Sequence, residues 1–145
     1  MSTILVLMVL FGGFFVWLRD YVHNRPIAWV PYSAEALARK RSEGRVVMVL
    51  VDANWHPAVT YTRVFAVETP GVRKFLRSHG IIAMEADWSE PSPDVNELLA
   101  SLNEQSVPIV AVFPAAEDAT PITLRDMATE DQVLAALQEA SGKPP

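Results

Sequence analysis

Hydrophobic residues are concentrated at the N-terminus, where residues 4–18 contain no charged side chain. Counted from the first residue, a helix of this segment would cover about 27 Å, close to the hydrocarbon thickness of a bilayer. Trp17 and Tyr21 stand where interfacial aromatic residues occur, and Arg19 follows the apolar stretch as a polar stop. The pattern predicts a single membrane-spanning helix over residues 1–20.

A cleaved signal peptide is the main alternative for this segment. It would require basic residues before the apolar stretch and a cleavage site with small residues, and the sequence has neither. We therefore favour a membrane anchor. Basic residues follow the segment rather than precede it, which favours a cytoplasmic position for the remainder of the chain.

Beyond the anchor, short apolar runs of strand length alternate with segments of helical period. This order predicts an α/β domain over residues 33–141, in which helices flank a central mixed four-stranded sheet, with residues 142–145 as a tail. The expected elements are a proline-containing linker over 21–32, helices over 34–43, 57–67, 71–78 and 94–103, and strands over 45–53, 81–86, 107–113 and 122–124. A capping box over residues 129–132 is expected to begin a last helix.

Composition supports one folded domain and excludes several functions. Of the 145 residues, 50% are hydrophobic and 20% are charged, which suits a single packed core. The net charge of −5 argues against a general nucleic-acid binder, and no glycine-rich nucleotide-binding motif is present. Twelve of the seventeen acidic residues follow position 84, so an acidic region is expected that favours a basic partner or only solubility.

The chain contains no cysteine, which removes disulfides, thiolate nucleophiles and thiolate metal ligands. The three histidines, His23, His56 and His79, are widely separated and have no spacing typical of a metal site. Asp52 and Asp87 could join His56, although nothing in their spacing requires it. We expect neither a metal nor a cofactor.

Two motifs resemble thioredoxin-like domains. Residues 44–55 read Gly-Arg-Val-Val-Met-Val-Leu-Val-Asp-Ala-Asn-Trp, and they are most similar to the strand that ends in Ala-Asp-Trp-Cys-x-x-Cys-Lys in the C-terminal periplasmic domain of DsbD-type thiol:disulfide interchange proteins. Residues 106–109 resemble the Val-Pro turn of this family, whose proline is cis and faces the active site, and residues 29–33 resemble the usual start of the domain. The resemblance covers roughly residues 27–140. It implies a thioredoxin-like fold. It also implies an extracytoplasmic position for the domain, whereas the basic residues after the apolar segment favour a cytoplasmic position.

The departures from the family motif concern the redox chemistry. The two cysteine positions fall on His56 and Val59, the following lysine on Thr60, and the buried acidic residue of many relatives on Leu50. Together these changes remove the nucleophile, the resolving thiol and the proton acceptor. The resemblance therefore implies a scaffold without disulfide exchange, and we do not expect an enzyme.

The candidate site is the former active-site turn together with the cis-proline groove. In active relatives this groove receives an extended polypeptide, and here it could bind a peptide without exchanging disulfides. The alternative is that Trp55 and Pro108 persist because they support the fold. The residues of the candidate site are Trp55, His56, Pro57, Ala58 and Val59 in the turn, and Val107 and Pro108 in the groove.

Two single residues allow a functional interpretation. His56, at the predicted start of a helix, could serve as a general base or ligand-binding group with Asp52 or Tyr61. Because no nucleophile is paired with it, we prefer a half-exposed histidine in a site that has lost its chemistry. Trp88 could anchor a partner, but an aromatic residue at a loop edge more often covers the core.

The sequence thus predicts a membrane-anchored, redox-inactive thioredoxin-like domain that binds a protein or peptide. One alternative is an accessory subunit of an envelope thiol-redox or cytochrome-maturation machine, in which another chain supplies the cysteines. A second alternative is a cysteine-independent enzyme that uses His56. The expected partners are the membrane, through residues 1–20, and a protein or peptide, and not a nucleic acid or a metal.

Overall fold

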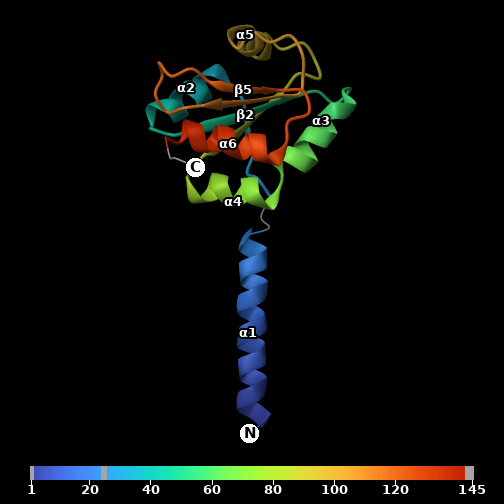
Figure 1. Ribbon diagram of the computed structural model, residues 1–145, viewed down its shortest axis with the longest axis vertical. Coiled ribbons are helices and arrows are strands. Elements are labelled where there is room, and N and C mark those ends of the chain that lie inside the picture. The colour runs from blue at the N-terminus through green and yellow to red at the C-terminus, as the bar shows by residue number, and fades with distance from the viewer. Residues whose placement is uncertain (1, 24–25, 143–145) are drawn as a thin grey trace.

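The computed structural model describes residues 2–23 and 26–142. A long N-terminal helix leads into a sheet that lies between two layers of helices (Figure 1). The elements in chain order are α1 (Ser2–His23), β1 (Val30–Pro31), α2 (Ala34–Ser42), β2 (Val47–Asp52), α3 (Pro57–Thr62), the π-helix η1 (Arg63–Val67), α4 (Pro70–Ser78), β3 (Ile82–Asp87), α5 (Pro93–Ser101), β4 (Ile109–Phe113), β5 (Ile122–Arg125) and α6 (Glu130–Ala140).

The sheet is mixed, with strand order β1-β3-β2-β4-β5. Strands β1, β3 and β2 run parallel, whereas β4 is antiparallel to β2 and to β5. The prediction of a mixed α/β sheet is confirmed, but the expected number of four strands is wrong. The fifth strand, β1, lies within the segment expected to be a linker, and it pairs through Val30 with Met84 and through Pro31 with Glu85. Because β1 is an edge strand, the missing N–H of Pro31 does not break a central ladder.

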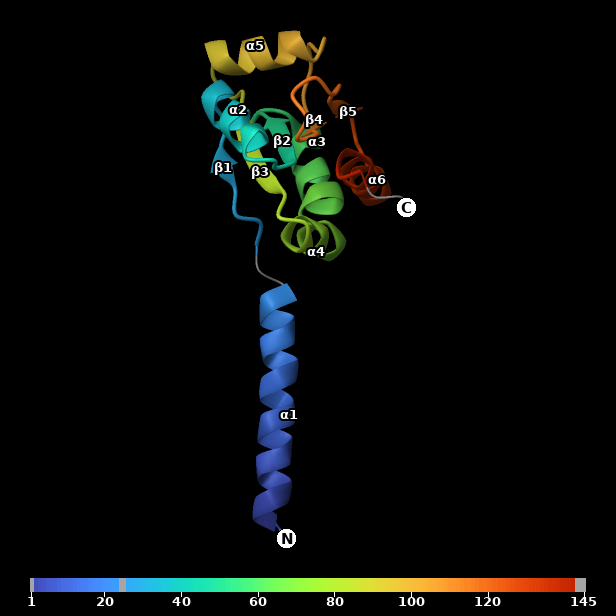
Figure 2. The same ribbon diagram turned by 90° about the vertical axis from the view of Figure 1, so that its left-hand side faces the viewer.

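The two faces of the sheet are covered by different helices, and the two layers are seen edge-on in Figure 2. Val47, Val49 and Val51 of β2 point toward α2 and α5. The alternate residues Met48 and Leu50 point toward η1, α4 and α6. This alternation follows from the period of two along a strand and creates two hydrophobic clusters, one on each side of the sheet.

The N-terminal helix α1 exposes its apolar side chains from Met8 to Leu18. Over the residues that the structure describes, no helix combines the length and the apolar character needed to cross a bilayer. The membrane span predicted over residues 1–20 is therefore not supported by the structure.

Candidate functional site

The former active-site turn connects β2 to α3. Pro57 occupies the first turn of α3, where its missing N–H breaks no helical hydrogen bond. His56 is the N-cap, and its Nδ1 accepts a hydrogen bond from the backbone N–H of Ala58 at 3.2 Å. The imidazole thus serves as a helix cap, a role usually filled by Ser, Thr, Asp or Asn. Val59 is buried, only 7% exposed, on the inner face of the helix.

The cis-proline lies at the same edge of the sheet as this turn. The Val107–Pro108 peptide bond is cis. Val51 pairs with Ile109 in the antiparallel ladder. Pro108, which precedes Ile109, therefore lies beside the carboxyl end of β2, directly before the 53–56 turn. Ile109 also pairs with Arg125, which brings residue 126 to the other side of Pro108. The structure therefore places the turn residues and the Val107–Pro108 pair together.

Aromatic side chains surround this edge. The Trp55 side chain is 58% exposed, and its ring centroid lies 5.7 Å from that of His56 and 6.2 Å from that of Trp88. Trp88 is only partly exposed, packs against the core, and donates from Nε1 to the Asn96 side-chain oxygen at 2.7 Å. Trp88 thus covers the core and Trp55 points outward.

Further apolar side chains are exposed along the outer face of α3 and η1. Tyr61 and Phe65 lie one turn apart with ring centroids 4.9 Å apart, and Phe65 is 62% exposed. Thr62 donates to the backbone oxygen of Asp126 at 3.5 Å, so this helix lies against the segment after β5. We call this the aromatic surface, formed by the exposed side chains of Trp55, Tyr61, Val64, Phe65 and Met127.

The sequence interpretation missed most of this surface. The spacing of Tyr61, Val64 and Phe65 fits one helical face, and such a face normally packs inward. The buried face is instead formed by Val59, Thr62, Ala66 and Val67. A helix that is apolar on both faces is the signal that could have revealed the exposed face.

On the same helical segment, Arg63 is the centre of an ionic cluster. Its guanidinium donates to the carboxylates of Asp52 and Glu85 and lies 3.4 Å from Glu68 Oε1. The same Glu68 oxygen accepts a hydrogen bond from Trp29 Nε1 at 3.0 Å, and the Arg63 guanidinium lies 5.2 Å from the centroid of the Trp29 ring. Arg63 begins the π-helix η1, in which the Glu68 N–H bonds to the Arg63 carbonyl at 2.7 Å.

Burial determines the electrostatics of this Arg63 cluster. Asp52 is only 7% exposed, and this burial raises the pKa of its carboxyl above the usual 3.8. The negative charges of Glu85 and Asp87 add to the rise, while the hydrogen bond and the charge of Arg63 oppose it. Burial also acts to lower the pKa of Arg63, but the contacts with Asp52 and Glu85 outweigh it and raise that pKa.

A metal site is not formed by these groups. Within residues 2–23 and 26–142, no three His, Cys, Asp or Glu side chains are grouped so that they could hold a metal ion. The combination of Asp52, His56 and Asp87 considered from the sequence is therefore not assembled.

Neither a known protein family nor a curated protein matches the chain at the level of sequence. Solved structures do match it. A thioredoxin from Thermus thermophilus is 23% identical, with a TM-score of 0.62 over 78% of this chain and 85% of that chain. The oxidised C-terminal domain of DsbD from Neisseria meningitidis is 14% identical, with a TM-score of 0.60 over 77% of this chain and 99% of that chain.

A third structure, described as the oxidoreductase DsbH, is 14% identical, with a TM-score of 0.61 over 81% of this chain and 86% of that chain. At these identities the likeness concerns the fold, and the chain has a thioredoxin-like fold. The particular similarity to DsbD-type domains expected from the sequence is not singled out, because the thioredoxin matches as well.

The Arg63 cluster leads to a prediction about stability. Arg63→Met would leave the buried Asp52 carboxylate beside Glu85 without its cation. We expect a loss of about 2–3 kcal/mol, below the ~3–5 kcal/mol of fully buried pairs because water reaches Arg63. Adding Asp52→Asn should restore more than half of this loss, since no unpaired buried charge remains. The free energies of unfolding of the two single variants and the double variant, from urea denaturation, measure the coupling.

Lys40→Met is the control, because Lys40 forms an exposed ion pair with Glu43 at 3.4 Å and its loss should cost less than about 0.5 kcal/mol. Simple additivity of Arg63→Met and Asp52→Asn would contradict the pairing.

The raised pKa of Asp52 predicts a pH dependence. The folded state holds the Asp52 proton at pH values at which the unfolded chain, with a pKa near 3.8, has released it. Stability contributed by this group therefore falls as the pH rises through the window between 3.8 and the raised value. We expect the parent to gain stability relative to Asp52→Asn as the pH is lowered from 7 toward 4, in parallel urea titrations. A difference between the two proteins that does not change with pH would contradict this assignment.

Proposed function

We propose that this protein is a redox-inactive thioredoxin-like domain, attached to a membrane by its N-terminal segment, that binds an extended segment of a partner protein. The observation that carries the proposal is the aromatic surface beside Pro108. Exposed aromatic side chains supply large contact areas at low entropic cost and commonly dominate binding energy at protein interfaces. The chain has no thiol that could carry out disulfide exchange at this edge of the sheet.

The loss of redox chemistry is supported by how the two former cysteine positions are now used. His56 uses Nδ1 to cap α3, and Val59 contributes to the buried face of the helix. Both side chains therefore stabilise the start of the helix. A cysteine-independent enzyme based on His56 is not favoured, because no nucleophile is hydrogen bonded to the imidazole among the described residues.

Charge beside the aromatic surface favours a basic partner segment. The loop after β3 lies against the turn, since the Asn54 N–H donates to the Ser89 hydroxyl at 2.9 Å. Asp87, the last residue of β3, and Glu90 in this loop are both exposed, and the exposed Asp126 lies next to Met127 at the other side. A segment that combines lysine or arginine with apolar residues would complement both the rings and the carboxylates.

Membrane attachment is supported by the apolar side chains of α1. Phe11, Phe15 and Trp17 are each about 60% exposed, on a helix whose apolar residues continue from Met8 to Leu18. A continuous apolar surface of this kind is stable only when lipid or protein covers it. We place the domain on the extracytoplasmic side, where the DsbD-type resemblance would put it, as an interaction or accessory module of envelope thiol-redox or cytochrome-maturation machinery.

Activity assays test the inactive state directly. The full chain in detergent should reduce insulin with dithiothreitol no faster than the blank, whereas His56→Cys with Val59→Cys should reduce it several-fold faster. The reason is geometric: residues three apart at the start of a helix have Cα atoms about 5 Å apart, within the ~4.4–6.8 Å range that a disulfide requires. His56→Cys alone is the control, because it lacks the resolving thiol. Reduction by the parent above the blank would remove the proposal.

Peptide selection tests the binding function. A library of 12-residue peptides displayed on phage and selected against the full chain should yield basic sequences with apolar residues. Their affinity should fall at least tenfold in Trp55→Ala and in Phe65→Ala, because both rings are exposed and their loss does not disturb the core. Thr120→Ala, in an exposed loop away from the turn, should bind as the parent does. Unchanged affinity in both aromatic variants, or no enrichment at all, would exclude this surface as the binding site.

A further inference from the structure

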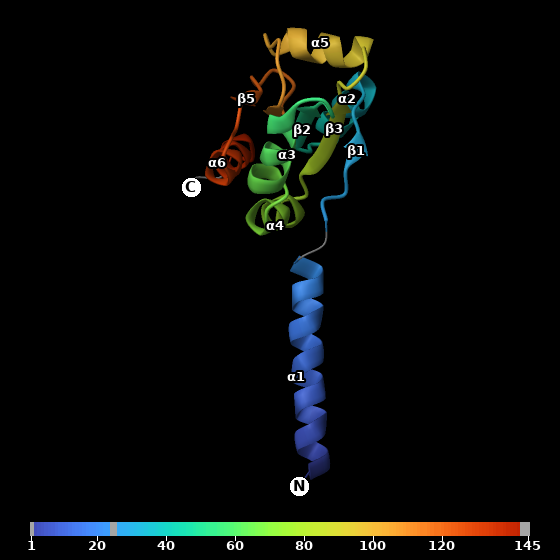
Figure 3. The same cartoon turned by 90° about the vertical axis from the view of Figure 1, so that its right-hand side faces the viewer.

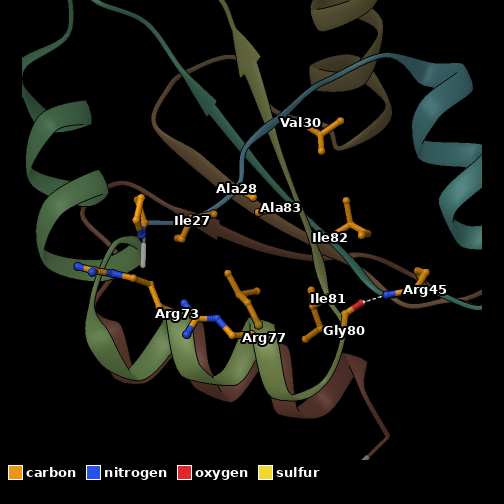
Figure 4. Close-up of a pocket in the computed structure, with 12 residues that line it drawn as sticks. Ile27, Ala28, Val30, Arg45, Arg73, Arg77, Gly80, Ile81, Ile82 and Ala83 are labelled. Atoms are coloured by element: carbon orange, nitrogen blue, oxygen red, sulfur yellow. Dashed lines mark hydrogen bonds between the residues drawn. The ribbon is translucent and has the colours of Figure 1, made fainter. Parts of the chain in front are cut away.

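A cavity of about 510 Å³ lies at the other end of the domain, between the segment that leads into β1, the start of β3, and α4 (Figure 4). Its volume is within the range of ~300–1,000 Å³ that is usual for small-molecule sites. The walls are largely apolar and include Ile27, Leu76, Ile81, Ile82 and Ala83.

The rim of this cavity is basic. Arg45, Arg73 and Arg77 line it, and none of the twelve described lining residues is acidic. Arg45 lies at one end of the cavity and Arg73 at the other, with Arg77 between them on α4 (Figure 4). Arg45 donates to the backbone oxygen of Gly80 at 2.9 Å, and Arg73 donates to that of Glu68 at 2.6 Å. These hydrogen bonds hold the two guanidinium groups in place.

The cavity also lies close to α1. Pro26, which lines it, is the third residue after the end of α1, and α1 contacts α4. In Figures 1 and 3, α1 leaves the domain on the side of α4. The last apolar residue of the exposed stretch, Leu18, is five residues from the end of α1, or about 7.5 Å at helical rise. This distance is similar to the ~5–8 Å thickness of the headgroup layer on each side of a bilayer.

We propose that this cavity binds an anionic phospholipid from the membrane to which α1 attaches the domain, an inference that rests on the proposed attachment. Guanidinium groups bind phosphate oxygens through paired, charge-assisted hydrogen bonds. The apolar wall accommodates the glycerol backbone and the first methylenes of the acyl chains. A free phosphate would bind the arginines but would leave the apolar wall without a contact. A zwitterionic lipid would bring a cationic group next to the basic rim.

Binding of short-chain lipids to the full chain in a neutral detergent tests the proposal. The probes are dioctanoyl phosphatidylglycerol, dioctanoyl phosphatidylcholine and inorganic phosphate, each titrated by native mass spectrometry at low salt. We expect a one-to-one complex with the phosphatidylglycerol, with at least tenfold weaker binding of the other two probes. Equal binding of both lipids, or of phosphate and phosphatidylglycerol, would overturn the proposal.

Two variants locate the lipid in the cavity. Arg77→Gln removes a rim charge, and Ala28→Leu places a larger side chain at an exposed lining position, so each should weaken phosphatidylglycerol binding at least fivefold. Lys74→Gln is the matched control, because Lys74 is exposed on the same helix but does not line the cavity. Circular dichroism establishes that each variant is folded. An equal loss in Lys74→Gln would indicate general surface charge and overturn the cavity assignment.

Flotation with vesicles separates this inference from the proposed attachment. The parent and Arg77→Gln should both float with pure phosphatidylcholine vesicles, because attachment depends on α1. If neither floats while short-chain phosphatidylglycerol still binds the parent selectively, the attachment is wrong and the lipid site stands. If both float but no lipid is selected, the attachment stands and the lipid site is wrong.

Discussion

The burial of β2 on both of its faces is the constraint from which the remaining structure follows. Residues 47–51 are apolar and at most 1% exposed, and β3 and β4 pair with the strand on either side. Such a strand requires a helical layer above and another below, and it tolerates a charge only at its end. Asp52 is that terminal charge, and Arg63 is the cation that compensates it. The ion pair therefore fixes η1, and with it the aromatic surface, against the end of the strand.

The buried acid of this domain lies two residues away from the position at which the sequence resemblance expects one. Leu50, at the position where many thioredoxin-like relatives carry the acid, is fully buried and packs among aliphatic side chains. Asp52 lies two residues further along the same face, and its carboxylate is bound by Arg63. The carboxylate is held by the guanidinium of Arg63, so this group contributes to the stability of the fold. At the turn, His56 caps α3 and Val59 packs on the buried face of this helix.

Most of the regular structure could be predicted from the sequence because it depends on local patterns. The apolar runs of β2, β3 and β4 and the capping box that begins α6 at Thr129 are read from neighbouring residues. Strand β1 could not be predicted, because two residues form no pattern and their pairing uses the backbone of β3. The Arg63 cluster was also missed, since Trp29 and Glu85 lie 34 and 22 residues away and only the topology brings them together.

Three arginines that precede the acidic part of the sequence lie at one end of the folded domain, and part of the later acidic residues lie at the other end. Because β2 and β3 run parallel, the arginine-rimmed cavity lies at their amino ends and the aromatic surface lies beyond their carboxyl ends. A six-residue strand separates these ends by about 20 Å. The arginines of the cavity therefore lie on the side of α1, and the acidic Asp87 and Glu90 lie at the opposite end of the strands. The proposed membrane contact and the proposed partner contact would therefore lie at opposite ends of the domain, and neither would block the other.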